Sequence, residues 1–264
     1  MVEAILAGLL GLLIGSFLNV CVYRMPRDLS VVHPRSFCPS CKTPVASYDN
    51  IPVISWLLLG RACRHCRAPI HWRYPLLELI TGVLFFAAVM YAGPTALAAK
   101  LCAISVVMIA LIFMDLEERI LADEFTLGGT LAGVVFAWFV PLPASLISML
   151  LPTDWDPRWQ SVAESAIAAC GLAFLLWGIG KLYYVVRRRE GMGFGDVKMV
   201  ACMGAFLGLP GALLALIIGS LLGSVGGGLM IWLGHKDPSS YQIPFGTFLG
   251  LGALCVAFGA LSGT

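Results

Sequence analysis

Long apolar stretches alternate along this chain with short polar segments that hold most of its charged residues. Most of these stretches approach the roughly twenty residues that an α-helix needs to cross a bilayer. The pattern therefore predicts an all-α, polytopic membrane protein of about eight transmembrane helices. The predicted helices cover residues 4–22, 75–91, 95–114, 125–140, 162–186, 197–209, 212–233 and 245–261.

The least certain boundary between predicted helices lies at Pro210-Gly211. A Pro-Gly pair is typical of a turn, which favours two separate helices here. The alternative is a kink between Gly208 and Gly211 inside one longer helix. Farther along, five glycines between residues 219 and 228 favour close helix packing, and bending for substrate access is the alternative.

The polar segment 24–73 indicates how the helices are oriented. It holds eight Lys and Arg residues but only two Asp residues, and such an excess marks a cytosolic segment. Counting helices from there brings Asp115 and Asp196 to the same cytosolic face, because one closes a predicted helix and the other opens one.

Composition supports this membrane assignment. The 264 residues are 59% hydrophobic and 12% charged, whereas soluble domains average about half apolar and about a quarter charged. We expect three parts: a first transmembrane helix (1–23), a cytosolic insert (24–73) and a seven-helix membrane core (74–264).

Asp115 and Asp196 are the first candidates for chemistry, because an acidic residue at a membrane helix is costly. Gly193 and Gly195 precede Asp196, and their lack of a Cβ lets another segment approach closely. The alternative is structural. Asp115 caps the charged link that follows its helix, Asp196 caps the helix that it opens, and Lys198 extends its side chain to the membrane interface.

Two aspartates that share a proton have coupled titrations, so one stays protonated near neutral pH. The ionised member can take a proton from water while the protonated member polarises a peptide carbonyl. This is the chemistry of aspartic proteases. Asp123, which opens the next predicted helix, is interpreted as an N-cap.

Four cysteines in the polar insert form a second candidate site. Cys38 and Cys41 form one C-x2-C pair, Cys63 and Cys66 form another, and twenty-one residues separate the pairs. This spacing predicts one structural zinc ion, which would supply the folding energy that a polar insert lacks. A redox pair or unligated thiols are the alternatives; a cytosolic location argues against disulfides.

Several of these motifs together resemble the type IV prepilin peptidase family of membrane aspartyl proteases, and they occur along nearly the whole chain in the family's order. The motifs are Gly15-Ser16-Phe17-Leu18-Asn19 with Arg24 and Pro26, the two cysteine pairs, Tyr74-Pro75 with Glu78, the segment 115–123, Gly193-Phe194-Gly195-Asp196-Val197-Lys198 and Ile243-Pro244-Phe245-Gly246.

The resemblance implies a bifunctional enzyme that removes a basic leader from type IV pilin and pseudopilin precursors. It then methylates the new N-terminus with S-adenosylmethionine. The implied catalytic pair is Asp115 and Asp196, with Gly193, Gly195 and Lys198 as active-site support.

For methyl transfer or substrate holding, the resemblance points to a second group of residues, Gly15, Asn19, Arg24 and Glu78. The residues alone support a plainer interpretation. Asn19 forms a hydrogen bond with a neighbouring helix, Arg24 suits a cytosolic helix end, and Glu78 near a helix N-terminus interacts favourably with the helix dipole.

Two positions depart from the family pattern, which usually has proline in place of Ala122 and often in place of Thr247. We expect neither residue to touch the two acids, so the departures concern local loop geometry.

The family resemblance places the protein in the bacterial inner membrane with its active site facing the cytosol. Expected partners are prepilins, pseudoprepilins and lipid, and no nucleic acid. A protease without methyl transfer is one alternative. The other is an ion- or proton-coupled transporter, which would need acids near the bilayer midplane and an inverted repeat.

Overall fold

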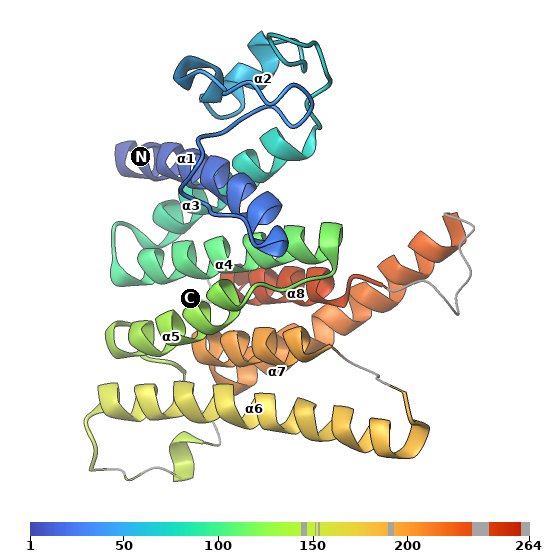
Figure 1. The fold of residues 1–264 in the computed structure, drawn as a ribbon. Coiled ribbons are helices and arrows are strands. Elements are labelled where there is room, and N and C mark those ends of the chain that lie inside the picture. Colours follow the sequence, from blue (N-terminus) through green and yellow to red (C-terminus); the bar gives the residue numbers. More distant parts are fainter. Residues whose placement is uncertain (144–146, 151, 153, 190–192, 234–242, 260–264) are drawn as a thin grey trace. The chain divides into compact units, whose positions relative to one another are not determined.

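The structure, a computed structural model, describes residues 1–143, 147–150, 152, 154–189, 193–233 and 243–259. Within these residues the chain is helical apart from loops and two isolated β-bridges (Figure 1). The elements are α1 (Val2–Arg24), the 3-10 helices η1 (Met25–Arg27) and η2 (Ser47–Asn50), α2 (Ile54–Leu58), α3 (Arg73–Ala92), α4 (Ala96–Glu118), α5 (Asp123–Phe139), the 3-10 helix η3 (Ser148–Leu150), α6 (Pro157–Arg187), α7 (Phe194–Leu233) and α8 (Phe245–Gly259).

Five of the described helices (α1, α3, α4, α6 and α7) are long and apolar enough to cross a membrane, and α8 is a shorter apolar helix. The predicted all-α, polytopic membrane class is therefore confirmed. The predicted number of about eight is not reproduced as separate helices. Residues 197–209 and 212–233 both fall within α7, in which two helices meet at the non-helical Gly208, and α5 and α8 contain only 17 and 15 residues.

The chain forms two compact units, residues 1–110 and 111–264. In the first unit, α1 and α3 lie side by side (Figure 1). A Cβ on Gly11 would lie 2.8 Å from the Thr81 carbonyl oxygen, and one on Gly15 would lie 2.7 Å from the Glu78 Cα. Glycine at these positions lets the two helix backbones approach closely.

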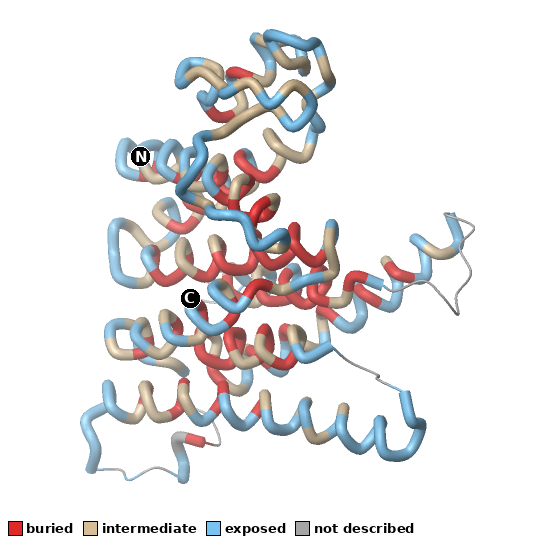
Figure 2. Tube along the Cα trace, viewed as in Figure 1, coloured by how far each residue is buried: buried red, intermediate tan, exposed pale blue. Residues whose placement is uncertain are grey.

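The polar insert between α1 and α3 has very little core of its own. Between residues 28 and 72, only Pro52 and Ser55 are buried, and Figure 2 shows the rest as exposed or intermediate. Two short hairpin-like turns are marked by the bridges Phe37–Pro44 and Ala62–Pro69. A segment with so few buried apolar groups needs another source of stability, such as a metal.

In the second unit, α7 changes direction at Gly208, whose φ of 68° and ψ of 179° are non-helical. Before this residue, α7 runs parallel to α8, because Met199 lies beside Gly250 and both helices start near Leu121. After it the two helices are antiparallel, because Gly219 contacts Leu249 and Gly227 contacts Ile243. The chain therefore reverses here, which fits the predicted turn better than a simple kink.

The glycines of the second part of α7 mostly serve packing. A Cβ on Gly219 would lie 2.9 Å from the Leu249 Cα, and one on Gly226 would lie 2.6 Å from the Phe248 ring. Gly228, in contrast, faces open space. The packing interpretation is thus supported for the glycines that face α8.

The first part of α7 also packs against α5 and α6. A Cβ on Gly204 would lie 2.9 Å from the Ala168 backbone of α6, and one on Gly133 of α5 would lie 2.8 Å from Ala205. Beyond Leu172, no described residue of α6 is buried (Figure 2). The polar start of α7, which carries Asp196, is therefore fixed by the close packing of the turns that follow it.

Candidate functional site

Asp115 lies in the last turn of α4, which continues past the apolar stretch that was expected to end at residue 114. The helix stops after Glu118, where Arg119 adopts a left-handed φ of 58° and its N–H donates to the Asp115 carbonyl at 3.1 Å. The Asp115 side chain is buried, and the whole residue is 6% exposed. Such a carboxyl group needs hydrogen-bond partners within the protein.

Thr247 of α8 supplies these partners. The Asp115 Oδ2 accepts the Thr247 backbone N–H at 2.7 Å and its hydroxyl group at 3.0 Å. The preceding Gly246 is equally close, since a Cβ there would lie 3.1 Å from the Asp115 Cγ. The expectation that Thr247 does not touch the acids is therefore wrong, because the first turn of α8 packs directly on the end of α4.

Asp196 lies in the first turn of α7, with Gly193 and Gly195 beside it. A Cβ on Gly193 would lie 3.7 Å from the Asp196 Oδ2, and one on Gly195 would lie 3.2 Å from the Leu121 Cβ. The preceding residues, Glu190-Gly191-Met192, lie outside the described part of the chain.

Leu121 connects the surroundings of the two acids. A Cβ on Gly195, the residue before Asp196, would contact the Leu121 side chain. A Cβ on Gly246, which lies against Asp115, would be 3.3 Å from the Leu121 Cδ1. The segments that carry the two carboxyl groups therefore meet at this one side chain. The structure thus brings together two acids that are 81 positions apart in the sequence.

Lys198, the third residue predicted to support the site, forms an ion pair with Asp123. The prediction that Asp123 is an N-cap is wrong. Ala122 occupies that position of α5, and Asp123 is the first residue of the helix. Its carboxylate instead links the start of α5 to the start of α7, so the pair fixes the two segments that follow the candidate acids.

The four predicted cysteines form one cluster. The sulfur atoms of Cys38, Cys41, Cys63 and Cys66 all lie within 4.8 Å of one another, and those of Cys38 and Cys66 are 3.8 Å apart. Two sulfurs on a tetrahedral zinc, with Zn–S distances of about 2.3 Å, lie about 3.8 Å apart. The cluster therefore fits one zinc ion with four thiolate ligands.

The four thiols of the cluster differ in their pKa values. Hydrogen bonds with the Thr43 hydroxyl and backbone lower the pKa of the Cys41 thiol to about 6. The pKa of Cys63 is lowered by the backbone of Cys66 and His65. Cys66 has a backbone hydrogen bond at Ala68, which acts to lower its pKa, yet desolvation and the other thiols raise it to about 11. Four thiolates in one place therefore require a positive charge between them.

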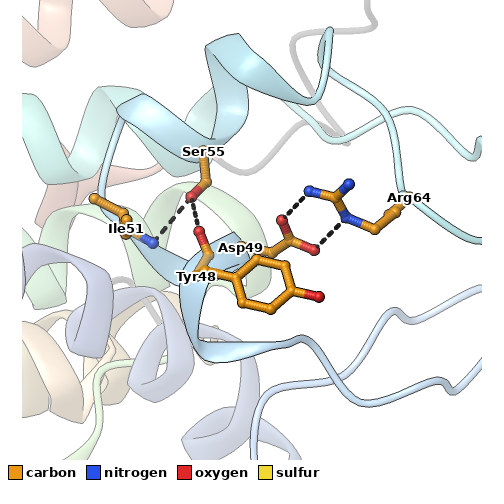
Figure 3. Close-up of polar contacts among 5 residues, drawn as sticks. All are labelled: Tyr48, Asp49, Ile51, Ser55 and Arg64. Carbon is orange, nitrogen blue, oxygen red and sulfur yellow. Dashed lines mark hydrogen bonds and ion pairs between the residues drawn. The ribbon is translucent and has the colours of Figure 1, made fainter.

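An ion pair that the sequence analysis missed ties the second cysteine pair to the rest of the insert (Figure 3). Arg64 donates from Nε to the Asp49 Oδ2 at 2.7 Å and from Nη2 to Oδ1 at 2.5 Å, and these bonds lower the pKa of the Asp49 carboxyl. Nearby, the Ser55 hydroxyl donates to the Tyr48 carbonyl and accepts the Ile51 N–H. Opposite charges fifteen positions apart give no sequence signal for such a contact.

Three of the four residues linked to methyl transfer surround a pocket of about 430 Å³ in the first unit. Asn19, Arg24 and Glu78 line it and are buried. Trp56 and Tyr74 are also among the lining residues. Gly15, the fourth candidate, does not line this pocket; it lies in the α1–α3 contact next to Glu78.

The polar groups of this pocket connect the two membrane helices to the insert. The Asn19 Nδ2 donates to the Tyr74 carbonyl at 3.0 Å, and the Glu78 Oε2 accepts the Val53 N–H at 2.8 Å. Arg24 donates to the Ser30 and Arg35 carbonyls. The Asn19 Oδ1 is buried without a hydrogen-bond partner among the described residues. An orphaned buried acceptor of this kind is a place for a ligand's hydrogen-bond donor.

Comparison with known proteins places this arrangement in a family. The bacterial peptidase A24 N-terminal domain matches residues 9–92, and the type IV leader peptidase family matches residues 102–228. Proteins named prepilin leader peptidase/N-methyltransferase from Aeromonas hydrophila and Neisseria gonorrhoeae are 34% and 32% identical to this chain. The alignments cover 92% and 83% of this chain and 86% and 79% of those proteins.

A protein of the same name from Myxococcus xanthus is 38% identical over 231 residues, which are 86% of this chain and 63% of that protein. No solved structure matches the chain. Matches of this identity extend over both the cysteine-containing insert and the segments that carry the two aspartates. The chain therefore belongs to the type IV leader peptidase family.

Proposed function

We propose that this protein is a membrane aspartyl endopeptidase that removes the basic leader from type IV pilin and pseudopilin precursors. It then N-methylates the new N-terminal residue. The observation that carries the proposal is the meeting of Asp115 and Asp196 around Leu121, in a chain whose relatives are named prepilin leader peptidase/N-methyltransferase.

Cleavage uses the two carboxyl groups in different protonation states. The ionised aspartate takes a proton from a water molecule as the water oxygen attacks the peptide carbonyl carbon. The protonated aspartate gives its proton to the carbonyl oxygen. In the second step the C–N bond breaks as the carbonyl re-forms. One hydroxyl of the intermediate returns its proton to the aspartate that gave it, and the other aspartate passes the proton taken from water to the amine nitrogen. The low polarity around Asp115 strengthens each of these interactions.

Gly193 supports this chemistry by leaving space beside Asp196, and Gly195 does so by letting Leu121 pack closely against the start of α7. An extended peptide can approach the acid along a backbone that has no Cβ atoms. Lys198 is held by Asp123 and so keeps the start of α7 against the start of α5. These contacts keep Asp196 in place while the peptide is bound.

The pocket lined by Asn19, Arg24 and Glu78 supports the methyl-transfer half of the proposal. Its volume of about 430 Å³ lies in the usual range of small-molecule sites, about 300–1,000 Å³. S-adenosylmethionine would supply the methyl group, Trp56 and Tyr74 offer aromatic surface, and the unpaired Asn19 Oδ1 offers an acceptor. Gly15 contributes by letting α3, which carries Glu78, approach α1.

The excess of basic residues between α1 and α3 supports an orientation with this insert, and both aspartates, on the cytosolic side of the inner membrane. The leader of a precursor lies on that side, and its apolar helix lies in the bilayer. The scissile bond then lies at the membrane boundary, where the acids are expected.

The experiment that tests the proposal measures the mass of the product. Purified protein in detergent is incubated with a pilin precursor, with and without S-adenosylmethionine. We expect a product without its leader in both reactions, heavier by one methyl group only when the donor is present. An intact precursor in both reactions would refute the peptidase activity. A cleaved but unmethylated product in both reactions would refute the methyltransferase activity and leave the peptidase activity standing.

Asn19→Leu separates the two activities. The variant loses the amide that bonds to Tyr74 and the buried acceptor Oδ1 of a residue that lines the pocket, so methyl transfer should fall at least about tenfold. Cleavage should stay within about twofold of wild type, and it serves as the internal control for folding. Equal losses of both activities would contradict the assignment of this pocket to methyl transfer.

A further inference from the structure

The contact between Asp115 and Thr247 joins the end of α4 to the start of α8. Thr247 is the third residue of α8, so its N–H belongs to the first turn, where backbone N–H groups have no partner within the helix. The Asp115 carboxylate accepts this N–H at 2.7 Å, as an N-terminal capping group would, although it comes from another helix 132 positions away.

Both hydrogen bonds from Thr247 end on the same oxygen. The backbone N–H can only donate, and the hydroxyl group also lies 3.0 Å from Oδ2. The hydroxyl carries one hydrogen, which it shares between Oδ2 and the Ile112 carbonyl 3.2 Å away, one turn before Asp115 on α4. This arrangement fixes the rotation of the carboxyl group and occupies Oδ2 with donors.

We propose that Thr247 is a positioning residue for leader cleavage: it holds Oδ2 of Asp115 and assigns the proton-accepting role to the other oxygen, Oδ1. The backbone N–H, which can only donate, suits an unprotonated oxygen at Oδ2, and the N-terminus of α8 favours a negative charge there. Asp115 then takes the proton from water, and Asp196 provides the proton for the carbonyl oxygen. This inference rests on the proposed function, because it takes Asp115 as catalytic.

The residue type matters at this position. A proline at this position would have neither the N–H nor the hydroxyl group that reaches Asp115. In this chain the fixed orientation of Asp115 therefore depends on groups that a proline would not provide.

Three variants test the role of Thr247 by leader cleavage under steady-state conditions. Thr247→Val keeps the N–H and the shape but loses the hydroxyl, so kcat should fall about three- to tenfold while KM stays the same. Thr247→Ser restores the hydroxyl and should return kcat to within about twofold of wild type. Thr247→Pro removes both donors and should lower kcat by at least about thirtyfold.

Thr130→Val is the matched control, because it also removes a hydroxyl that donates to a helix carbonyl, that of Thr126. Its kcat should stay at the wild-type value. Zinc content and thermal unfolding in detergent report whether each variant is folded. If Thr247→Pro does not fold, the kcat values of Thr247→Val and Thr247→Ser still test whether the hydroxyl group is needed.

Several outcomes would overturn the inference alone. A wild-type kcat for Thr247→Val, a loss that serine does not restore, or a change in KM instead of kcat would each exclude a positioning role. Asp115→Asn measured in parallel separates this from failure of the proposed function. If Asp115→Asn is inactive while Thr247→Val is normal, only the inference fails. If Asp115→Asn cleaves normally, the proposed function fails as well.

Discussion

Asp115→Asn and Asp196→Asn are each expected to lower kcat for leader cleavage by about 10³-fold or more. General acid–base groups contribute about 10²- to 10⁴-fold each, and an amide can neither take the proton from water nor supply one to the carbonyl. Because the two acids act as a unit, the double variant should be no slower than the worse single variant. Both substitutions preserve size, so the packing around Leu121 and Gly246 should be retained.

Rates of leader removal from a purified pilin precursor measure this effect. Glu124→Gln is the matched control, because this exposed acid in the first turn of α5 loses its charge in the same way without reaching the pair. Methylation of a pre-cleaved substrate should survive in both aspartate variants and would show that they are folded. Wild-type cleavage by either aspartate variant would rule out the catalytic pair.

Cys63→Ser is expected to have the largest effect on stability. It removes one of four thiolates that converge within 4.8 Å, and structural zinc contributes about 10–16 kcal/mol of apparent binding free energy in zinc-finger peptides. The insert has only Pro52 and Ser55 buried between residues 28 and 72, so it has little else to hold it together. We expect zinc to fall from one ion per chain to a small fraction, and the insert to unfold locally.

Metal analysis and limited proteolysis of the insert measure this loss. Cys255→Ser is the control, because this exposed cysteine of α8 lies outside the cluster. Methyl transfer should be lost with the zinc, since Cys38 and Cys63 also line the pocket that holds Asn19. A full complement of zinc in Cys63→Ser would show that the four thiols do not form the metal site.

What the sequence predicted well depends on local spacing. The apolar stretches indicated the membrane helices, and the two C-x2-C pairs indicated the cluster of four cysteines, because both signals are contained in short segments. The helix ends were less accurate. α4 was expected to stop at residue 114, but it continues to Glu118, since charged residues can extend a helix beyond the apolar part.

The contacts that orient the candidate site could not be predicted, because they join distant segments. Thr247 and Asp115 are 132 positions apart, and neither residue type predicts the other. The sequence marks Thr247 only as a departure from the family pattern. Asp123 was interpreted from its place before a helix, yet it pairs with Lys198 across 75 positions. Such pairs depend on how helices pack, which periodicity and spacing do not determine.

The pH dependence of kcat for leader cleavage tests most directly whether Asp115 and Asp196 share one proton. At low pH both acids are protonated and neither can accept a proton from water; at high pH both are ionised and neither can polarise the carbonyl. The account predicts a bell-shaped dependence of kcat on pH for the wild-type protein. In either Asn variant, kcat should be too low at every pH for this dependence to be measured. A profile that rises with pH and then stays level, with both carboxylates ionised, would contradict it.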